Sequence, residues 1–286
     1  MELTRRALFG TLAGAGLAAL PSRARDLAGL KIGVMDGVVG ATGKPEAIAI
    51  AAKLGFDGVE LNIGKPDPAG NLALMDGGLQ ARFLEESRKH QIALASTCLD
   101  VLHINCLKND ELAKKWVRQG IDVTRKLNAR VMLLPFFGKC GLVNRAEIDA
   151  SAEALRELAP VAEKAGVVLG LESLLKAEDN VYVLDKVKSR ALLVYYDVGN
   201  LTNLAGMDAV QEIRQLGPRI GQIHFKDRGY MGEGKVNFPE VLRAVREIGY
   251  QGWGVLETNW PSKNMEADNR RNLDYLRGVI RQVEGG

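Results

Sequence analysis

Four side chains that could bind a divalent cation recur about one strand and one helix apart in the second half of the sequence. They are Glu172, Asp197, His224 and Glu257, and each closes a short apolar run. If these runs are neighbouring parallel strands of a closed barrel, their ends meet at one mouth and the four side chains share a pocket. Three carboxylates and one imidazole form a ligand set for a divalent cation. The spacing therefore predicts a metal-dependent enzyme.

Each of these residues also has an ordinary structural interpretation. A glutamate at a strand end is more often solvated or ion-paired, Asp197 could cap the next turn, and His224 could be a hydrogen-bonded core histidine. The coincidence of position in consecutive units favours a shared role instead. Carboxylates that converge within a few ångströms repel one another unless a cation or a proton compensates them. A shared metal ion is the simplest compensation.

The body of the sequence alternates short apolar runs with longer amphipathic segments, as strands and helices do. Strands are expected at residues 31–35, 58–63, 92–97, 130–135, 167–172, 191–197, 220–225 and 252–257. Helices are expected at 45–54, 78–89, 110–127, 145–165, 177–187, 207–215, 239–248 and 264–283. This alternation predicts an α/β fold, a single (β/α)8 barrel. An open doubly wound sheet is the main alternative, but the glycines after Met35 lack the spacing of its phosphate-binding turn.

The N-terminus has the features of a cleavable export signal. Arg5 and Arg6 precede an apolar run rich in glycine and alanine, and the small-residue stretch 22–24 follows Pro21. Adjacent arginines are typical of the twin-arginine signal. The run is too short and glycine-rich for a membrane span of ~20 residues, although it could be a helix docked on the barrel. We expect residues 1–24 to be removed, leaving 25–286 as a periplasmic barrel with no stable membrane span.

Charge and cysteine content exclude two other classes of protein. The formal net charge is +3, and no basic run with interleaved aromatic residues is present, so nucleic acid is a poor partner. Cys98, Cys106 and Cys140 are too few for a disulfide scaffold, and we expect them to be small buried hydrophobic side chains. Export would allow a Cys98–Cys106 bridge, which the spacing alone does not support.

Five short motifs resemble the xylose isomerase-like barrel superfamily of sugar isomerases and epimerases, which includes ketose 3-epimerases and hydroxypyruvate isomerase. They are Gly-Leu-Glu-Ser at 170–173, Tyr-Asp-Val-Gly-Asn at 196–200, Ile-His-Phe-Lys-Asp at 223–227, Gly-Glu-Gly at 232–234 and Val-Leu-Glu-Thr at 255–258. The resemblance implies that Glu172, Asp197, His224 and Glu257 bind one divalent ion. It implies that the two glutamates also exchange substrate protons. Glu178 matches a further glutamate that contacts substrate hydroxyls or tunes Glu172, although it could also be an exposed helix acid.

These residue types suit proton transfer next to a sugar carbonyl. A divalent ion acts as Lewis acid on the carbonyl oxygen; the oxygen-rich ligand set suits Mn²⁺, Mg²⁺ or Co²⁺, with Zn²⁺ as a further candidate. Two glutamates on opposite faces of the substrate would epimerise a carbon, and one glutamate that returns the proton to the adjacent carbon would isomerise an aldose and a ketose. A lyase or hydrolase acting on a keto-sugar or glycoside is the alternative, and a non-catalytic carbohydrate-binding barrel is a second.

Further contacts to a small carbohydrate are expected around the mouth. Lys226 could bind a hydroxyl or carbonyl, Glu60 ends the second predicted strand, and Asn200 could orient Asp197. Asp36, Arg228 and the aromatic residues Phe136, Phe137, Trp253 and Trp260 are weaker candidates. Abasic-site endonucleases of the same superfamily need several more histidines. The sequence has Asn200 at one of these positions, which argues against an endonuclease. Because barrels of this group often associate, a homo-oligomer is also expected.

Overall fold

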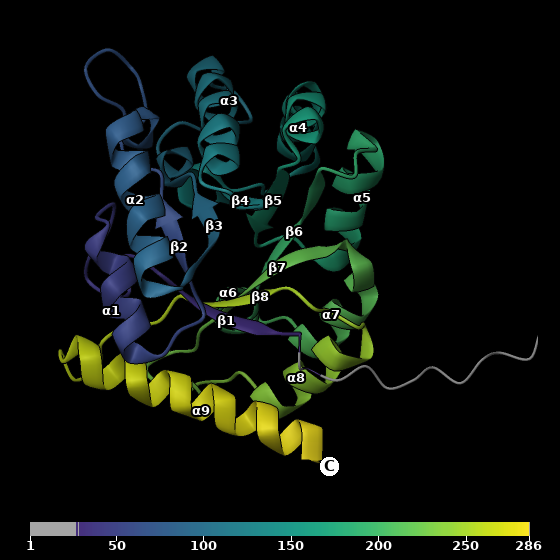
Figure 1. Cartoon of the computed structure of the whole chain (residues 1–286). Helices are drawn as coiled ribbons and strands as arrows, with labels where there is room; N and C mark the ends of the chain where they lie inside the picture. The colour runs from purple at the N-terminus through teal and green to yellow at the C-terminus, as the bar shows by residue number, and fades with distance from the viewer. Residues whose placement is uncertain (1–26, 28, 286) are drawn as a thin grey trace, which may run out of the picture.

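The computed structural model describes residues 27 and 29–285, which form a closed barrel of eight parallel strands inside a ring of helices (Figure 1). The strands follow one another in sequence order, and the last pairs with the first. The prediction of a single (β/α)8 barrel is therefore confirmed. The predicted export signal, residues 1–24, lies outside the described residues.

The predicted elements agree with the observed ones to within one residue at the strand ends and two at the helix ends. The strands are β1 (Lys31–Met35), β2 (Gly58–Asn62), β3 (Ala93–Cys98), β4 (Val131–Phe136), β5 (Val168–Ser173), β6 (Leu192–Asp197), β7 (Ile220–Phe225) and β8 (Trp253–Leu256). The helices are α1 (Glu46–Leu54), α2 (Gly77–His90), α3 (Glu111–Lys126), α4 (Arg145–Ala165), α5 (Ala177–Val187), α6 (Val198–Asn203), α7 (Ala209–Leu216), α8 (Phe238–Glu247) and α9 (Met265–Gly285). The sequence does not predict α6, which begins directly after β6.

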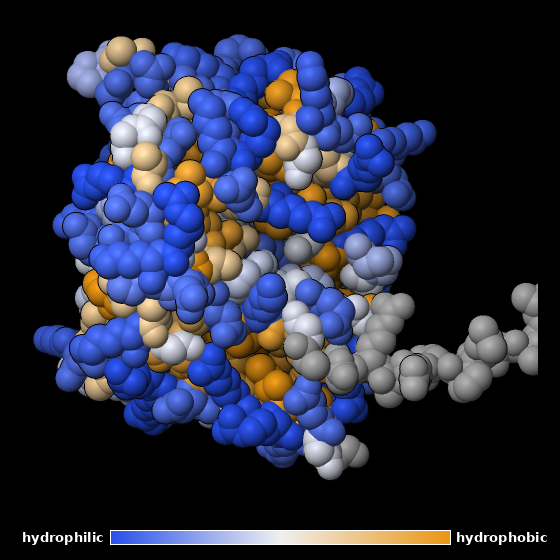
Figure 2. Space-filling model, in the orientation of Figure 1, coloured by the Kyte–Doolittle hydropathy of each residue, from blue (hydrophilic) through white to orange (hydrophobic). Residues whose placement is uncertain are grey.

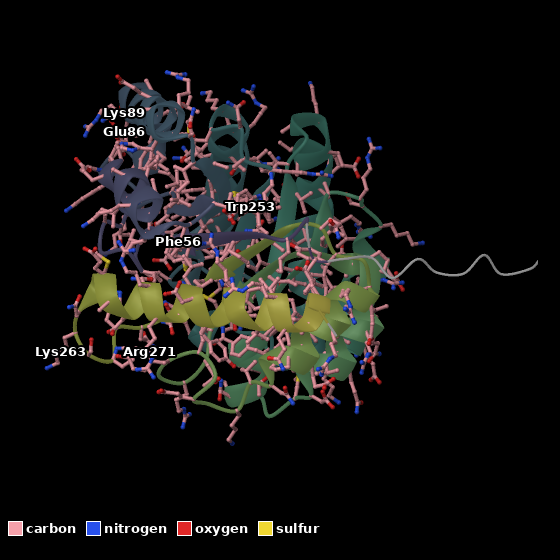
Figure 3. The ribbon with its side chains drawn as sticks, turned by 60° about the horizontal axis from the view of Figure 1, so that its bottom comes forward. Phe56, Glu86, Lys89, Trp253, Lys263 and Arg271 are labelled. Carbon is pink, nitrogen blue, oxygen red and sulfur yellow. A yellow bond between two sulfur atoms is a disulfide. The ribbon has the colours of Figure 1, made fainter. Side chains whose placement is uncertain are left out.

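Local sequence explains where these elements begin and end. Every residue of β4 is buried, as expected of a parallel strand covered on both faces. The side chain of Asn144 caps α4 by accepting a hydrogen bond from the Glu147 N–H, and Gly166 ends that helix in the left-handed conformation. Figure 2 shows mostly hydrophilic side chains over the outer helices, with apolar ones between them. In Figure 3, Glu86 and Lys89 point away from the body of the molecule.

Short 3-10 helices in the loops after β3 and β4 bring two cysteines together. These helices are η2 (Asp100–His103) and η3 (Gly138–Cys140), and the others are η1 (Ala73–Met75) and η4 (Gly217–Arg219). All three cysteines are buried, as expected, but a disulfide that the sequence did not predict joins Cys106 to Cys140. Cys98 is free and buried, and the Cys98–Cys106 pairing does not form. The bridge ties together two loops at the mouth of the barrel.

A search of the described residues for a membrane-spanning helix finds none of sufficient length and apolar character.

Candidate metal and active site

The last four strands carry the four predicted side chains to one place. Glu172 is the last residue but one of β5, Asp197 ends β6, His224 is the last residue but one of β7, and Glu257 follows β8 directly. The strand register pairs Asp197 with His224, and the Glu257 N–H donates to the carbonyl oxygen of Phe225 at 3.2 Å. One ligand atom from each of the four side chains lies within 4.8 Å of the others. We call these four residues the carboxylate–histidine cluster.

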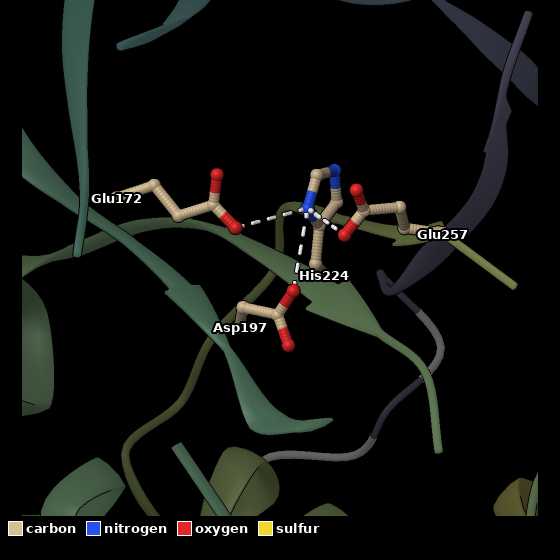
Figure 4. Close-up of side chains that lie close together, drawn as sticks. All are labelled: Glu172, Asp197, His224 and Glu257. Atoms are coloured by element: carbon tan, nitrogen blue, oxygen red, sulfur yellow. Dashed lines mark ion pairs between the residues drawn. The ribbon is translucent and has the colours of Figure 1, made fainter. Parts of the chain in front are cut away.

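The cluster is arranged around Nδ1 of His224 (Figure 4). This nitrogen lies 3.5 Å from Glu172 Oε1, 3.8 Å from Asp197 Oδ2 and 3.4 Å from Glu257 Oε2. Figure 4 shows Glu172 and Glu257 approaching it from opposite sides. Neither His224 Nδ1 nor Asp197 Oδ2 has a hydrogen-bond partner among the described residues. Because buried polar atoms are normally partnered, these two unpartnered atoms, together with the carboxylates of Glu172 and Glu257, fit a divalent cation.

Lys226 supplies part of the positive charge that these carboxylates need. Its Nζ forms ion pairs with Glu257 and with Asp197 Oδ2, which lies 3.0 Å away but outside hydrogen-bond geometry. Burial, reinforced by the charges of Glu257 and Glu172, raises the pKa of Asp197 to about 7 against the effect of Lys226. Burial also opposes ionisation of Glu257, but contacts with His224 and Lys226 outweigh it and hold the pKa of Glu257 below its usual value. Burial opposes protonation of His224, but its contacts with Glu60, Glu172 and Glu257 raise the pKa of the imidazole well above its usual value, so without a bound cation the imidazolium and Lys226 together compensate these carboxylates.

A second group of buried polar residues lies next to the cluster, deeper in the barrel. Glu60 is fully buried, and its Oε1 lies 3.0 Å from Nε2 of His224. Its Oε2 accepts hydrogen bonds from Ser96 Oγ at 2.5 Å and Tyr195 Oη at 2.8 Å, and Gln222 Nε2 donates to both hydroxyls. We call Glu60, Ser96, Tyr195 and Gln222 the Glu60 network. Since an ionised carboxylate can only accept, the proton of a neutral His224 sits on Nε2 and Nδ1 presents its lone pair to the cluster.

Two of the predicted substrate-binding residues lie away from the mouth. β2 runs on to Asn62, two residues past Glu60, which sets Glu60 about 6–7 Å deeper than the strand end. Glu60 therefore contacts His224 and not the open cavity, which corrects the predicted substrate contact. Glu178 is exposed on the first turn of α5 and does not line the cavities above the cluster. Its position matches the structural alternative for this residue, an exposed helix acid.

Two other predicted residues lie beside the cluster. Asn200 donates its backbone N–H to Asp197 Oδ1 at 2.7 Å, and its side-chain amide lies 3.5 Å from Glu172 Oε1. Asn200 and Lys226 both line the open space above the cluster. Their positions are compatible with substrate contacts, which stay a prediction.

The cavity above the cluster has a volume of about 260 Å³ and includes a residue to which the sequence assigned no role. His103, in η2, lines this cavity together with cluster residues, and its Nδ1 lies 2.9 Å from Asp100 Oδ1. The hydrogen bond from His103 to Asp100 raises the pKa of the imidazole. The ring stacks on Phe137 with centroids 6.0 Å apart. Position alone could have indicated His103, because it lies five residues past the end of β3, at the same end of the barrel as the cluster residues.

The remaining aromatic candidates divide between the two ends of the barrel. Trp260 follows β8 and lines a larger cavity of about 830 Å³ beside the cluster. Trp253 is the first residue of β8, so it lies at the opposite end of the barrel, where its ring packs under Gly58. Figure 3 labels Trp253 and Phe56 within the ring of helices. Phe136 is buried in the core. Only Phe137 and Trp260 among these four aromatics could meet a ligand at the mouth.

Comparison with known proteins gives the same architecture. A family model described as a xylose isomerase-like TIM barrel matches residues 48–279. An L-ribulose 3-epimerase from Methylomonas sp. is 28% identical over 239 residues, which cover 77% of this chain and 79% of that protein. An uncharacterized protein from Methanocaldococcus jannaschii is 31% identical over 122 residues, and there the match spans 37% of this chain and only 41% of the relative.

Solved structures of similar proteins share the fold at low sequence identity. A structure of L-ribulose 3-epimerase superimposes with a TM-score of 0.73 and 19% identity, covering 90% of this chain and 96% of the other. A D-allulose 3-epimerase from Methylomonas sp. in complex with D-allulose gives a TM-score of 0.71 and 19% identity, covering 87% and 97%. Both are similar to this chain over nearly the whole barrel.

Proposed function

We propose, from the premise that this chain belongs to the xylose isomerase-like TIM barrel family, that it is a metal-dependent enzyme that epimerises or isomerises a sugar. One observation carries the proposal: ligand atoms of Glu172, Asp197, His224 and Glu257 lie within 4.8 Å of one another at the mouth of the barrel. Relatives of similar length include a sugar epimerase, which supports the same reaction class.

The four cluster residues would hold one divalent cation. When bound, the cation would polarise the substrate carbonyl and stabilise the negative charge that develops on its oxygen. Oxygen donors from Glu172, Asp197 and Glu257 with one imidazole suit Mn²⁺, Mg²⁺ or Co²⁺, and Zn²⁺ is a further candidate. The Glu60 network would keep Nδ1 of His224 free of its proton and facing the cluster.

Glu172 and Glu257 would act as the acid and base. One carboxylate removes the proton from the carbon next to the carbonyl, and the electron pair of that C–H bond moves toward the carbonyl oxygen. The other glutamate returns a proton to the opposite face of the same carbon, which inverts it. Return of the proton to the neighbouring carbon gives an isomer instead. The approach of the two glutamates from opposite sides favours the first outcome (Figure 4).

Lys226 and Asn200 would orient the substrate. The Lys226 ammonium group can donate to a substrate hydroxyl or carbonyl while its pairing with Glu257 keeps that glutamate ionised. The amide of Asn200, beside Glu172, can donate to or accept from a hydroxyl. These contacts would place one carbon between the two glutamates.

Deuterium exchange from solvent tests this proposal. Protein loaded with Mn²⁺ is incubated in D₂O with a panel of ketoses and keto-glycosides, and products are analysed by mass and by NMR. We expect a substrate whose carbon next to the carbonyl gains deuterium and whose product is an isomer of otherwise equal mass. Absence of exchange across the panel by metal-loaded, folded protein would contradict the proposal.

One observation favours a second candidate, a lyase or hydrolase that acts on a keto-sugar or glycoside. The pair of His103 and Asp100 lines the same cavity as Glu172, His224 and Glu257 and could protonate a leaving group after the first proton is removed. The same assay separates the two candidates, because elimination or hydrolysis releases a smaller fragment where epimerisation conserves mass.

We also propose that the protein is exported by a twin-arginine signal. The N-terminal sequence motivates this proposal, and the Cys106–Cys140 disulfide supports it because disulfides persist mainly in oxidising compartments. Sequencing the N-terminus of the native protein tests it: a start near residue 25 is expected, and an intact Met1 or Glu2 would contradict it.

A further inference from the structure

We infer that the mouth of the barrel continues into a second sugar-binding subsite, formed around Trp260, and that the preferred substrate is a keto-sugar carrying a second sugar ring. This inference rests on the proposed function, because the subsite extends the same active site. It names a larger substrate than the free ketose that fits over the cluster alone.

The two cavities at the mouth are adjacent. The smaller one, about 260 Å³, lies directly over the cluster, and the larger one, about 830 Å³, lies beside it. Both are lined by Met35, Asn200, Leu204, Lys226 and Glu257, so the two cavities meet along these five side chains. The smaller cavity lies just below the range of about 300–1,000 Å³ that is usual for ligand sites. A sugar that reacts beside Glu257 therefore has open space next to it for a substituent.

The lining of the larger cavity includes an anchored, partly exposed aromatic ring. Trp260 keeps 38% of its surface exposed, although its indole N–H donates to the carbonyl oxygen of Val38 at 2.7 Å. The ring rests against Gly40, where a Cβ atom would come within 3.3 Å of it. Leu204 is 64% exposed and also lines this cavity. An anchored indole beside exposed apolar carbon suits the apolar face of a second ring.

Polar side chains line the same cavity. Asn203, Arg228 and Asn259 are part of its lining. The Arg228 guanidinium forms no ion pair or hydrogen bond with any other residue in the described part of the chain, which leaves its donors available. An aromatic face with amides and a guanidinium nearby matches a sugar ring, which has an apolar face and hydroxyls around its edge. A flat aromatic substituent would leave the amides unused, and an isolated carboxylate would leave the indole unused.

The test compares one ring with two. The 3-keto derivatives of cellobiose and glucose serve as probes, and kcat/KM for deuterium exchange is measured for each with Mn²⁺-loaded protein. We expect kcat/KM to be at least tenfold higher for the disaccharide, and Trp260→Ala to remove most of this preference. Trp260→Phe should restore much of it. Tyr182, which is 37% exposed on α5 away from the mouth, provides the matched control: Tyr182→Ala should keep the wild-type preference.

Binding of unreactive sugars separates failure of this inference from failure of the proposed function. Cellobiose and glucose are titrated into the metal-loaded protein by calorimetry. If neither keto-sugar exchanges deuterium, the proposed function is contradicted, and the binding result still decides the subsite. A Kd for cellobiose at least tenfold below that for glucose, lost in Trp260→Ala, supports the subsite. Equal affinities, or tighter binding of phenyl glucoside than of cellobiose, overturn the assignment of a second sugar.

Discussion

Two groups of buried polar side chains lie side by side in the barrel, and they differ in whether the hydrogen bonds of their carboxylate and imidazole atoms are complete. Gln222 Oε1 is the one atom of the Glu60 network that lacks a partner among the described residues. In the Glu60 network both oxygens of the glutamate accept hydrogen bonds or contact the imidazole. In the carboxylate–histidine cluster, His224 Nδ1 and Asp197 Oδ2 have no hydrogen-bond partner among the described residues. His224 belongs to both groups, through one ring nitrogen each.

This difference in hydrogen bonding distinguishes residues that hold the structure from residues that could bind a ligand. A buried polar network whose members satisfy one another holds a fixed geometry, whereas an unpaired buried group costs about 1–3 kcal/mol. A fold keeps such groups where a ligand completes them. Glutamate occurs in both groups, so depth in the barrel and the neighbouring donors decide its role, not its residue type. Glu60 lies among hydroxyl donors, whereas Glu257 pairs with the Lys226 ammonium group and Glu172 lies 3.5 Å from the Asn200 amide.

The largest effect is expected from removing one charge from the incomplete group. Glu257→Gln keeps the shape of the side chain but cannot accept a proton, so we expect turnover to fall at least a hundredfold. Steady-state assay of product formation measures this. Glu178→Gln makes the same chemical change on an exposed glutamate and should stay within twofold of wild type. A Glu257→Gln enzyme with near-wild-type rates would contradict the proposed role.

Metal binding should stabilise the fold through the same group. A cation present at a hundred times its Kd adds about 2.7 kcal/mol to the free energy of unfolding, which corresponds to a rise in Tm of about 5–10 °C. We expect Mn²⁺ to raise Tm by this amount after treatment with a chelator, as measured by calorimetry. Asp197→Asn, which removes one ligand charge, should abolish most of the rise. An equal rise in that variant would place the ion elsewhere.

A smaller effect is expected from the complete group. In Glu60→Gln the amide has one acceptor oxygen where the carboxylate has two, so either His224 or the two hydroxyls lose their acceptor. We expect the affinity for Mn²⁺ to fall about 10–100-fold, as is usual when the partner of a ligating histidine is removed. Ser96→Ala deletes one donor to Glu60 but keeps the contact with His224, and its loss should be smaller. Calorimetric titration distinguishes the two variants, and unchanged affinity in Glu60→Gln would show that the network does not position His224.

The smallest effect is expected from the loops above the cluster. Replacing Cys106 and Cys140 with serine removes the covalent link between the two loops. One loop contains η2 with His103, and the other contains η3, which begins directly after Phe137. We expect KM for the sugar to rise about threefold, because loosened loops must be ordered on binding. The Kd for Mn²⁺ should stay within twofold. A large change in metal affinity would mean that the loops support the cluster and not the substrate alone.

The sequence predicted most of what depends on order along the chain. Apolar runs and helices that end in glycine predicted all eight strands. Because the carboxyl ends of parallel strands in a barrel meet at one mouth, the sequence also predicted that Glu172, Asp197, His224 and Glu257 lie together. This prediction succeeded because parallel strands in a closed barrel leave little freedom for their ends.

What depends on depth and on contacts between loops could not be predicted from the sequence. Glu60 was expected at the mouth, but it lies two residues before the end of β2 and is buried below His224. The disulfide joins cysteines 34 residues apart whose loops meet only because β3 and β4 are neighbours. Trp253 and Trp260 look alike in sequence, yet they lie at the start and past the end of β8 and so at opposite ends of the barrel.

Crystallography with Mn²⁺ tests the central claim most directly, because anomalous scattering locates the ion without reference to activity. We predict one strong peak among Glu172, Asp197, His224 Nδ1 and Glu257, with ligand distances of about 2.0–2.4 Å and with Lys226 withdrawn from at least one of its carboxylates. A peak at another site, or none at the cluster in a crystal grown at saturating Mn²⁺, would contradict the account.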